Sequence, residues 1–255
     1  MGVRYDYAYI AITRKGEIMT SIIEQGSAFL QALVAWQQQL PNLSWNELHE
    51  DIEAERVALF SVDMIKGFCT EGPLSSPRIQ GIVPEVVATF EHAYTAGVRD
   101  FILAQDAHTP DAVEFESYPP HCVEGTSEAE TIPELAQLSF AELFTIVPKN
   151  SLNPFHGTEL LAWQDIHRDL SMAIVVGNCT DLCVYEMAMH LKLYANAHNR
   201  KMRVIVPANA VQTFDTPIET AQQLGILPHN GDVLHLLFLY HMRLNGIEVV
   251  REITV

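Results

Sequence analysis

The chain has 255 residues, of which 48% are hydrophobic, and its 15 basic and 32 acidic side chains give a formal net charge of −17. That charge opposes binding to phosphate backbones and to anionic lipid surfaces, so we expect neither a nucleic acid nor a membrane as a partner. The sequence has no apolar run long enough for a signal peptide or a membrane span, and its four cysteines are too sparse for a disulfide scaffold, so we expect a cytoplasmic protein with reduced thiols.

The N-terminal part of the chain differs in pattern from the rest. Residues 1–18 follow neither a helical nor a strand pattern, and Met19 is an alternative start of the chain. From Ser21 to Leu40 apolar residues recur at roughly helical spacing, which predicts one amphipathic helix that ends before a Pro-Asn pair. We therefore predict an N-terminal extension, residues 1–50, and a main domain, residues 51–255.

The main domain alternates between short β-branched runs and longer helical patterns. This alternation is typical of a parallel sheet covered on both faces, and it predicts the α/β class: a three-layer α/β/α fold with a mainly parallel, Rossmann-like sheet. The strands are expected at Val57–Val62, Phe101–Ala104, Phe144–Val147, Ala173–Val176, Val204–Val206 and Val249–Val255, and the helices at Pro84–Ala96, Leu182–Ala195, Thr216–Leu224 and Asp232–Leu244.

Reactive side chains follow several of the expected strands. Ligands of open α/β sheets bind beyond the carboxyl ends of the strands, where Asp63, Lys149 and Cys183 are expected. Each also has an ordinary interpretation: Asp63 as a turn cap, Lys149 as a surface charge and Cys183 as core filler. Cys183 should lie in or near the first turn of a helix, where free backbone N–H groups and the helix dipole favour a thiolate.

A second group of polar residues follows the strand at Phe101–Ala104. Asp106 and His108 are two residues apart, so in an extended chain they point to the same side. Carboxylates and a further histidine follow downstream, and such a set suits Zn²⁺, Mn²⁺ or Fe²⁺ with positions open for water or a substrate nitrogen. Loop histidines bonded to the backbone are the alternative. The downstream residues are Glu114, Glu116 and His121.

The motifs VDMIKGFC, QDAHTPD, YPPHCVEGT, VPKNSLNPF and VVGNCTDLCV occur in the order in which isochorismatase-like cysteine hydrolases carry them. The chain resembles that family over about residues 55–255, and within it is most similar to the nicotinamidases. The resemblance makes residues 51–255 an isochorismatase-like hydrolase domain and implies a catalytic triad of Asp63, Lys149 and Cys183. The other cysteines are not the nucleophile.

The same resemblance implies a metal site and a ring-binding pocket. One divalent transition metal is expected on Asp106, His108 and His121, with Glu114 as the fourth ligand and Glu116 as its competitor. Zinc is the first choice, and manganese or iron are the alternatives. The resemblance also assigns two aromatic residues to a planar ring, although they can equally cover the pocket floor; these are Phe68 and Tyr118.

The nucleophile loop of the family contains a non-proline cis peptide, here expected between Asn178 and Cys179. It would aim the backbone N–H groups of Cys179 and Cys183 at a substrate oxyanion. Such bonds are costly and are kept for function.

The implied reaction is the hydrolysis of nicotinamide to nicotinate and ammonia through a thioester on Cys183. Asp63 takes the thiol proton, Lys149 stabilises developing negative charge, and the metal orients the ring through its nitrogen. The alternatives are a related cysteine amidohydrolase acting on a carbamoyl or ureido substrate, and a non-catalytic binding protein on this fold. The expected partner is a small molecule, and a homo-oligomer is left open.

Overall fold

The structure, a computed structural model, describes residues 15–50 and 52–254. Within these residues the centre of the molecule is a parallel seven-stranded sheet of order β4-β3-β2-β5-β6-β8, with β7 paired to the end of β5. The strands are β2 (Val57–Val62), β3 (Asp100–Asp106), β4 (Phe144–Lys149), β5 (Met172–Asn178), β6 (Arg203–Pro207), β7 (Val211–Gln212) and β8 (Glu248–Val250).

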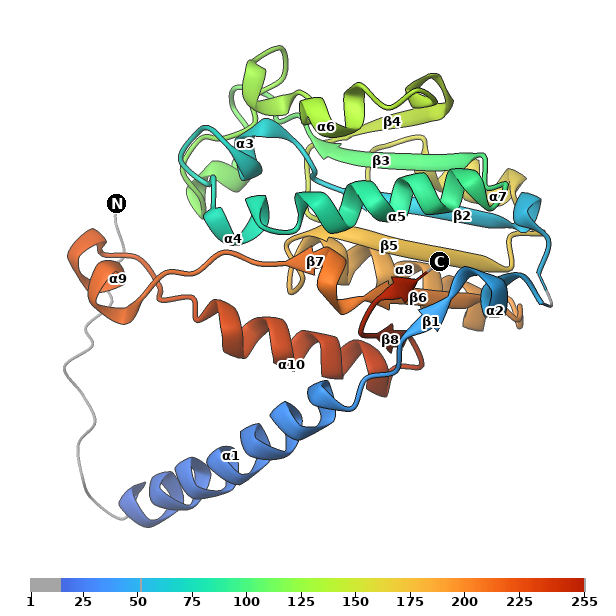
Figure 1. Cartoon of the computed structure of the whole chain (residues 1–255). Helices are drawn as coiled ribbons and strands as arrows, with labels where there is room; N and C mark the ends of the chain where they lie inside the picture. The colour runs from blue at the N-terminus through green and yellow to red at the C-terminus, as the bar shows by residue number, and fades with distance from the viewer. Residues whose placement is uncertain (1–14, 51, 255) are drawn as a thin grey trace.

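Helices cover both faces of this sheet. Successive residues of a strand point to opposite faces, so Leu59 and Phe60 of β2 belong to two different core clusters. Helix α5 (Val83–Thr95) contributes to the cluster of Leu59, and α8 (Cys183–Ala197) contributes to that of Phe60. Figure 1 shows these two helices on opposite sides of the strands. The predicted three-layer α/β/α fold is confirmed.

The remaining helices connect the strands or lie at the edges of the sheet. None of the described helices is both long enough and apolar enough to cross a bilayer. The longer ones are α1 (Lys15–Gln38), α7 (Leu160–Ile166), α9 (Ile218–Leu224) and α10 (Gly231–Leu244), and the short ones are α2 (Trp45–His49), α3 (Lys66–Cys69), α4 (Pro77–Gln80) and α6 (Pro133–Ala136). Short 3₁₀ turns span Ala54–Arg56, Val113–Glu116, Ser127–Ala129, Ala141–Leu143 and Ala208–Ala210.

Helix α1 starts earlier than its apolar pattern predicts. It begins at Lys15 rather than Ser21, and Lys15, Glu17 and Met19 in this added segment are good helix formers. Its C-terminal half packs beside α10 (Figure 1), where the ring of Trp36 meets that of Tyr240 at 5.3 Å. Residues 1–14 lie outside the described residues. The division into an extension and a main domain stays a prediction.

The predicted single strand Val249–Val255 is wrong. The run instead forms β8 and a separate strand, β9 (Ile253–Thr254), which leaves the main sheet and pairs with β1 (Leu43–Ser44). Backbone bonds reinforce this exchange, since Arg251 N–H donates to the carbonyl of Pro41 at 2.8 Å. The residues after α1 are thereby attached to the C-terminal segment. The residue pattern of neither segment alone indicates that the two pair.

Candidate active site

Four neighbouring strands end at one edge of the sheet and bring the predicted polar residues together. Asp106 and Lys149 are partners in the register of β3 and β4, and Asp63 follows β2 directly. The side-chain amide of Asn178, the last residue of β5, donates to the backbone carbonyl of Asp63 at 2.6 Å. The loop that follows Asn178, which contains the predicted nucleophile and is called the nucleophile loop below, is therefore held against the end of β2.

Gly177 makes this close approach of β5 to β2 sterically accessible. Its φ is +114°, and a Cβ placed there would lie 2.1 Å from the backbone oxygen of Val62. Only glycine combines that backbone conformation with that contact. The position of the nucleophile loop relative to Asp63 depends on this residue.

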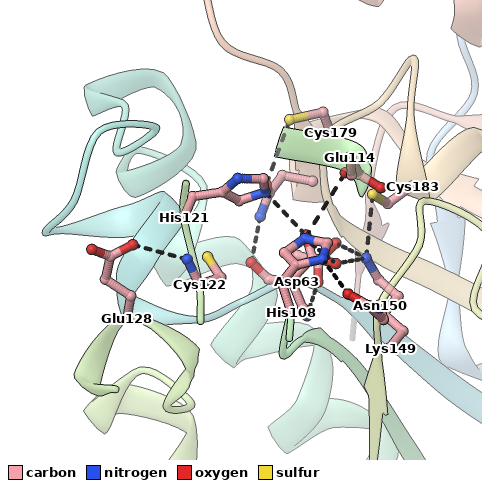
Figure 2. A network of polar contacts seen from close by, with 12 residues as sticks. Asp63, His108, Glu114, His121, Cys122, Glu128, Lys149, Asn150, Cys179 and Cys183 are labelled. Carbon is pink, nitrogen blue, oxygen red and sulfur yellow. Dashed lines mark hydrogen bonds and ion pairs between the residues drawn. The ribbon is translucent and has the colours of Figure 1, made fainter. Parts of the chain in front are cut away.

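Lys149 lies at the centre of the predicted triad (Figure 2). Its Nζ is 2.9 Å from Asp63 Oδ2 and 2.5 Å from Asp106 Oδ1, and it donates to the Sγ of Cys183 at 3.5 Å. All four residues are buried. Burial lowers the pKa of Lys149, but the two carboxylates outweigh it and hold that pKa well above its ordinary value. The lysine is thus a fixed cation beside the thiol.

The carboxyl of Asp63 and the thiol of Cys183 are both shifted toward their neutral forms. Burial and the charge of Asp106 raise the pKa of Asp63 to about 6, against the opposing effect of Lys149. Burial likewise raises the pKa of Cys183 well above its ordinary value, although Lys149 lowers it. Burial thus acts on Cys183 against the thiolate that a helix N-terminus favours.

Asp106, His108 and His121 form a buried cluster whose ligand atoms lie within 4.8 Å of one another. The Nδ1 of His108 contacts Asn150 Oδ1, and that of His121 contacts the carbonyl of Pro119, each at 2.9 Å. These acceptors fix the proton on Nδ1 and leave each Nε2 as a ligand facing Asp106. His108 Nε2 is buried without a hydrogen-bond partner. This donor set fits a divalent transition metal.

The loop between His108 and His121 contains two glutamates, and its conformation places only one of them near the metal-ligand cluster. Backbone bonds from His108 N–H to Cys122 O, at 3.0 Å, and from Glu124 N–H to His108 O, at 2.9 Å, bring the two histidines together. Glu114 Oε1 lies 3.9 Å from His108 Nε2, whereas Glu116 of the same 3₁₀ turn is exposed. Figure 2 shows Glu114 directed toward the histidines.

The backbone of the nucleophile loop presents two N–H groups next to the thiol. The Asn178–Cys179 peptide is cis, and Cys183 is the first residue of α8. Among the described residues, the N–H groups of Cys179 and Cys183 donate to no protein acceptor, whereas the N–H groups of Leu182 and Val184 both donate to Cys179 O. The two free donors suit a developing oxyanion.

A pocket opens over these groups. Phe68 and Tyr118 line it, with ring centroids 5.7 Å and 6.2 Å from that of His121. Further lining residues that the sequence did not reveal are Leu74, Leu152, Leu182 and Phe214. Phe214 follows the two-residue strand β7, which is too short for a recognisable pattern. Had the sequence marked the end of a strand at β7, that strand end would have indicated Phe214 as a pocket residue.

A buried thiol, a carboxyl with a pKa near 6 and a lysine cation thus lie together beneath one pocket. The isochorismatase domain pattern matches residues 57–233, which is more than half of the sequence. The chain belongs to the isochorismatase-like family of hydrolases.

Three known proteins illustrate the range of this similarity. Nicotinamidase 1 of Arabidopsis thaliana is 29% identical over 213 residues, which are 78% of this chain and 86% of that protein. The pyrazinamidase of Pyrococcus horikoshii, solved in complex with zinc, is 23% identical with a TM-score of 0.59 over 77% of this chain and 99% of that one. The N-carbamoylsarcosine amidase of Thermoplasma acidophilum is 24% identical with a TM-score of 0.55, over 76% and 95%. The two structures show the shared fold.

Proposed function

We propose that the chain is a nicotinamidase, which hydrolyses nicotinamide to nicotinate and ammonia through a thioester on Cys183. The observation that carries the proposal is the buried contact of Lys149 with both Asp63 and Cys183 beneath a pocket that a metal-ligand cluster also lines. The similarity to the Arabidopsis nicotinamidase supports the choice of substrate.

In the acylation step, Asp63 accepts the thiol proton of Cys183 as Sγ attacks the carboxamide carbon. The carbonyl oxygen becomes an oxyanion, which accepts hydrogen bonds from the backbone N–H groups of Cys179 and Cys183. One such donor contributes about 10²–10³ in rate in related hydrolytic sites. Asp63 then passes the proton to the amide nitrogen, the C–N bond breaks and ammonia leaves. Lys149 stabilises the negative charge on Cys183 during the transfer.

In the deacylation step, water attacks the thioester carbon while Asp63 accepts a proton from the water. The C–S bond breaks, nicotinic acid leaves and releases its proton to solvent to become nicotinate, and the proton on Asp63 returns to the sulfur of Cys183. One water is consumed for each amide. A pKa of about 6 suits Asp63 for both directions of proton transfer near neutral pH.

Asp106, His108, His121 and Glu114 are proposed to hold one divalent transition metal, with zinc as the first choice. The zinc in the Pyrococcus relative supports this assignment. When bound, the metal supplies a Lewis acid that accepts the lone pair of a ring nitrogen. Independently, Phe68 and Tyr118 are proposed to hold the substrate ring against the pocket walls.

The experiment that tests the function measures ammonia release from nicotinamide and from N-carbamoylsarcosine, with and without a chelator. Rapid release from nicotinamide that Cys183→Ala abolishes is the expected result. Hydrolysis of the carbamoyl compound alone would identify the related amidohydrolase instead. Binding of both compounds without turnover would identify a non-catalytic protein.

A further inference from the structure

Phe214 lines the pocket and takes no part in the triad or the metal-ligand cluster. The segment that carries it runs beside the nucleophile loop, since Thr180 N–H donates to Gln212 O at 3.1 Å. The other two aromatic lining residues instead contact the ring of His121. Phe214 therefore reaches the pocket from the nucleophile-loop side, and the other two from the metal-ligand side.

A histidine holds Phe214 in place from behind. The rings of Phe214 and His229 are stacked, with centroids 3.8 Å apart and planes inclined by 16°. His229 Nδ1 faces the backbone carbonyl of Phe214 at 3.0 Å, and its Nε2 faces Asp181 Oδ2 at 2.8 Å. These two contacts hold the imidazole ring from both of its nitrogens and keep its face against the phenyl ring of Phe214.

Asp181 connects this stacked pair to the nucleophile. It is buried and lies two residues before Cys183 in the chain. Burial raises its pKa, but the contact with His229 and the nearby hydroxyl of Thr213 outweigh that effect and lower it. The backbone of His229 also pairs with Thr216 through two hydrogen bonds, of 2.7 and 2.9 Å. The wall that contains Phe214 is thus attached to the loop that contains Cys183.

We propose that Phe214 is a specificity-determining residue that packs against the flat ring of the substrate and limits its width, and that His229, held by Asp181, positions it. This inference rests on the proposed function, because it assigns ring recognition at the same site. An aromatic side chain at a pocket wall gains most from a planar aromatic ligand. Losing that contact area corresponds to about 10- to 100-fold in kcat/KM.

The first test compares nicotinamide with quinoline-3-carboxamide, which keeps the ring nitrogen and the carboxamide but adds a second ring. For Phe214→Ala we expect kcat/KM for nicotinamide to fall about 10- to 100-fold, mainly through KM. The preference should shift toward the wider amide, and Phe214→Tyr should retain the wild-type preference. General damage to the fold would lower both rates together. An unchanged preference in Phe214→Ala overturns the proposal.

A matched control is His190→Ala. His190 also stacks on a phenylalanine, Phe155, at 3.5 Å and 8°, but neither residue lines the pocket. This variant should leave the preference between the two amides at its wild-type value. A shift as large as that of Phe214→Ala would mean that the preference reports on stability and would overturn the assignment of Phe214.

The positioning role is tested by a double-mutant cycle. His229→Ala should shift the preference in the same direction as Phe214→Ala, and it should have no further effect on the preference in the Phe214→Ala background. Additive shifts overturn the role of His229. A wrong assignment of the substrate is distinguishable from a wrong role of Phe214, because in the first case the wild-type protein hydrolyses another amide instead of nicotinamide. The variants are then compared on narrow and wide forms of that amide, and an unchanged preference again refutes the role of Phe214.

Discussion

Replacing Asp63 by asparagine separates the charge of this residue from its shape. Asp63 has a φ of +53°, and asparagine tolerates the left-handed region as readily as aspartate. The backbone N–H of Asp106 donates to Asp63 Oδ1 at 2.8 Å, and an asparagine oxygen can accept the same bond. Asp63→Asn therefore keeps the backbone conformation and the hydrogen bond but removes the proton acceptor and the negative charge.

The expected change in stability follows from the raised pKa of Asp63. Burial and Asp106 raise that pKa from 3.8 to about 6. An acid with a higher pKa in the folded state binds its proton more tightly there. Its stabilising contribution to the free energy of unfolding is therefore fully present below pH 3.8 and is lost as the pH rises through 6. The loss is about 3 kcal/mol in total at about 1.36 kcal/mol per pH unit, of which about 2 kcal/mol falls between pH 4.5 and 7.5. Asparagine has no titrating proton, so the free energy of unfolding of Asp63→Asn does not contain this pH-dependent loss.

The assay is urea unfolding of the metal-free protein at pH 4.5 and pH 7.5. Between these conditions Asp63→Asn should gain about 2 kcal/mol in its free energy of unfolding relative to the wild type. With metal restored, kcat should fall by about 10²-fold or more, because Asp63 is the proposed general base.

A second carboxylate beside the same lysine provides the control. Burial raises the pKa of Asp106, but the charge of Lys149 and the bonds from His108 and His121 outweigh it and hold that pKa below its ordinary value. Asp106→Asn should therefore have a lower free energy of unfolding than the wild type at neutral pH. This change is opposite in sign to the one expected for Asp63→Asn. If Asp63→Asn at pH 7.5 is instead destabilised by the roughly 3–5 kcal/mol typical of a broken buried ion pair, the attraction of Lys149 outweighs the cost of burying the charge of Asp63, contrary to the prediction.

Three further predictions concern the nucleophile, the metal and the substrate. Cys183→Ala should abolish turnover while leaving the unfolding transition cooperative, and a substrate-derived mass adduct on any other cysteine would contradict the assignment. Purified protein should contain about one transition metal per chain by elemental analysis, and the double variant His108→Ala/His121→Ala should lose it; full retention would exclude these ligands. Nicotinamide should have a kcat/KM more than about 10²-fold above that of benzamide, which lacks the ring nitrogen, whereas equal values would show that this nitrogen is not recognised.

The amino-acid sequence by itself determined the class of fold and the positions of its main strands along the chain. The strand Val57–Val62 is predicted to the residue, because a short apolar run between polar segments is a local signal. Parallel strands present their carboxyl ends at one edge, so the sequence also indicated that Asp63, Asp106 and Lys149 would meet. The motifs around them predicted the family, which the match over residues 57–233 confirms.

Other features were decided only by the tertiary structure, because they depend on contacts between distant segments and on burial. Two glutamates in one loop have the same chemistry, and only the fold turns Glu114 rather than Glu116 toward the histidines. The contact between Asp181 and His229 joins residues 48 positions apart, which no local pattern encodes. Burial likewise raises the pKa of Cys183, although its place at a helix N-terminus favours the thiolate, because the exclusion of water from an ionisable group depends on all the segments that pack around it.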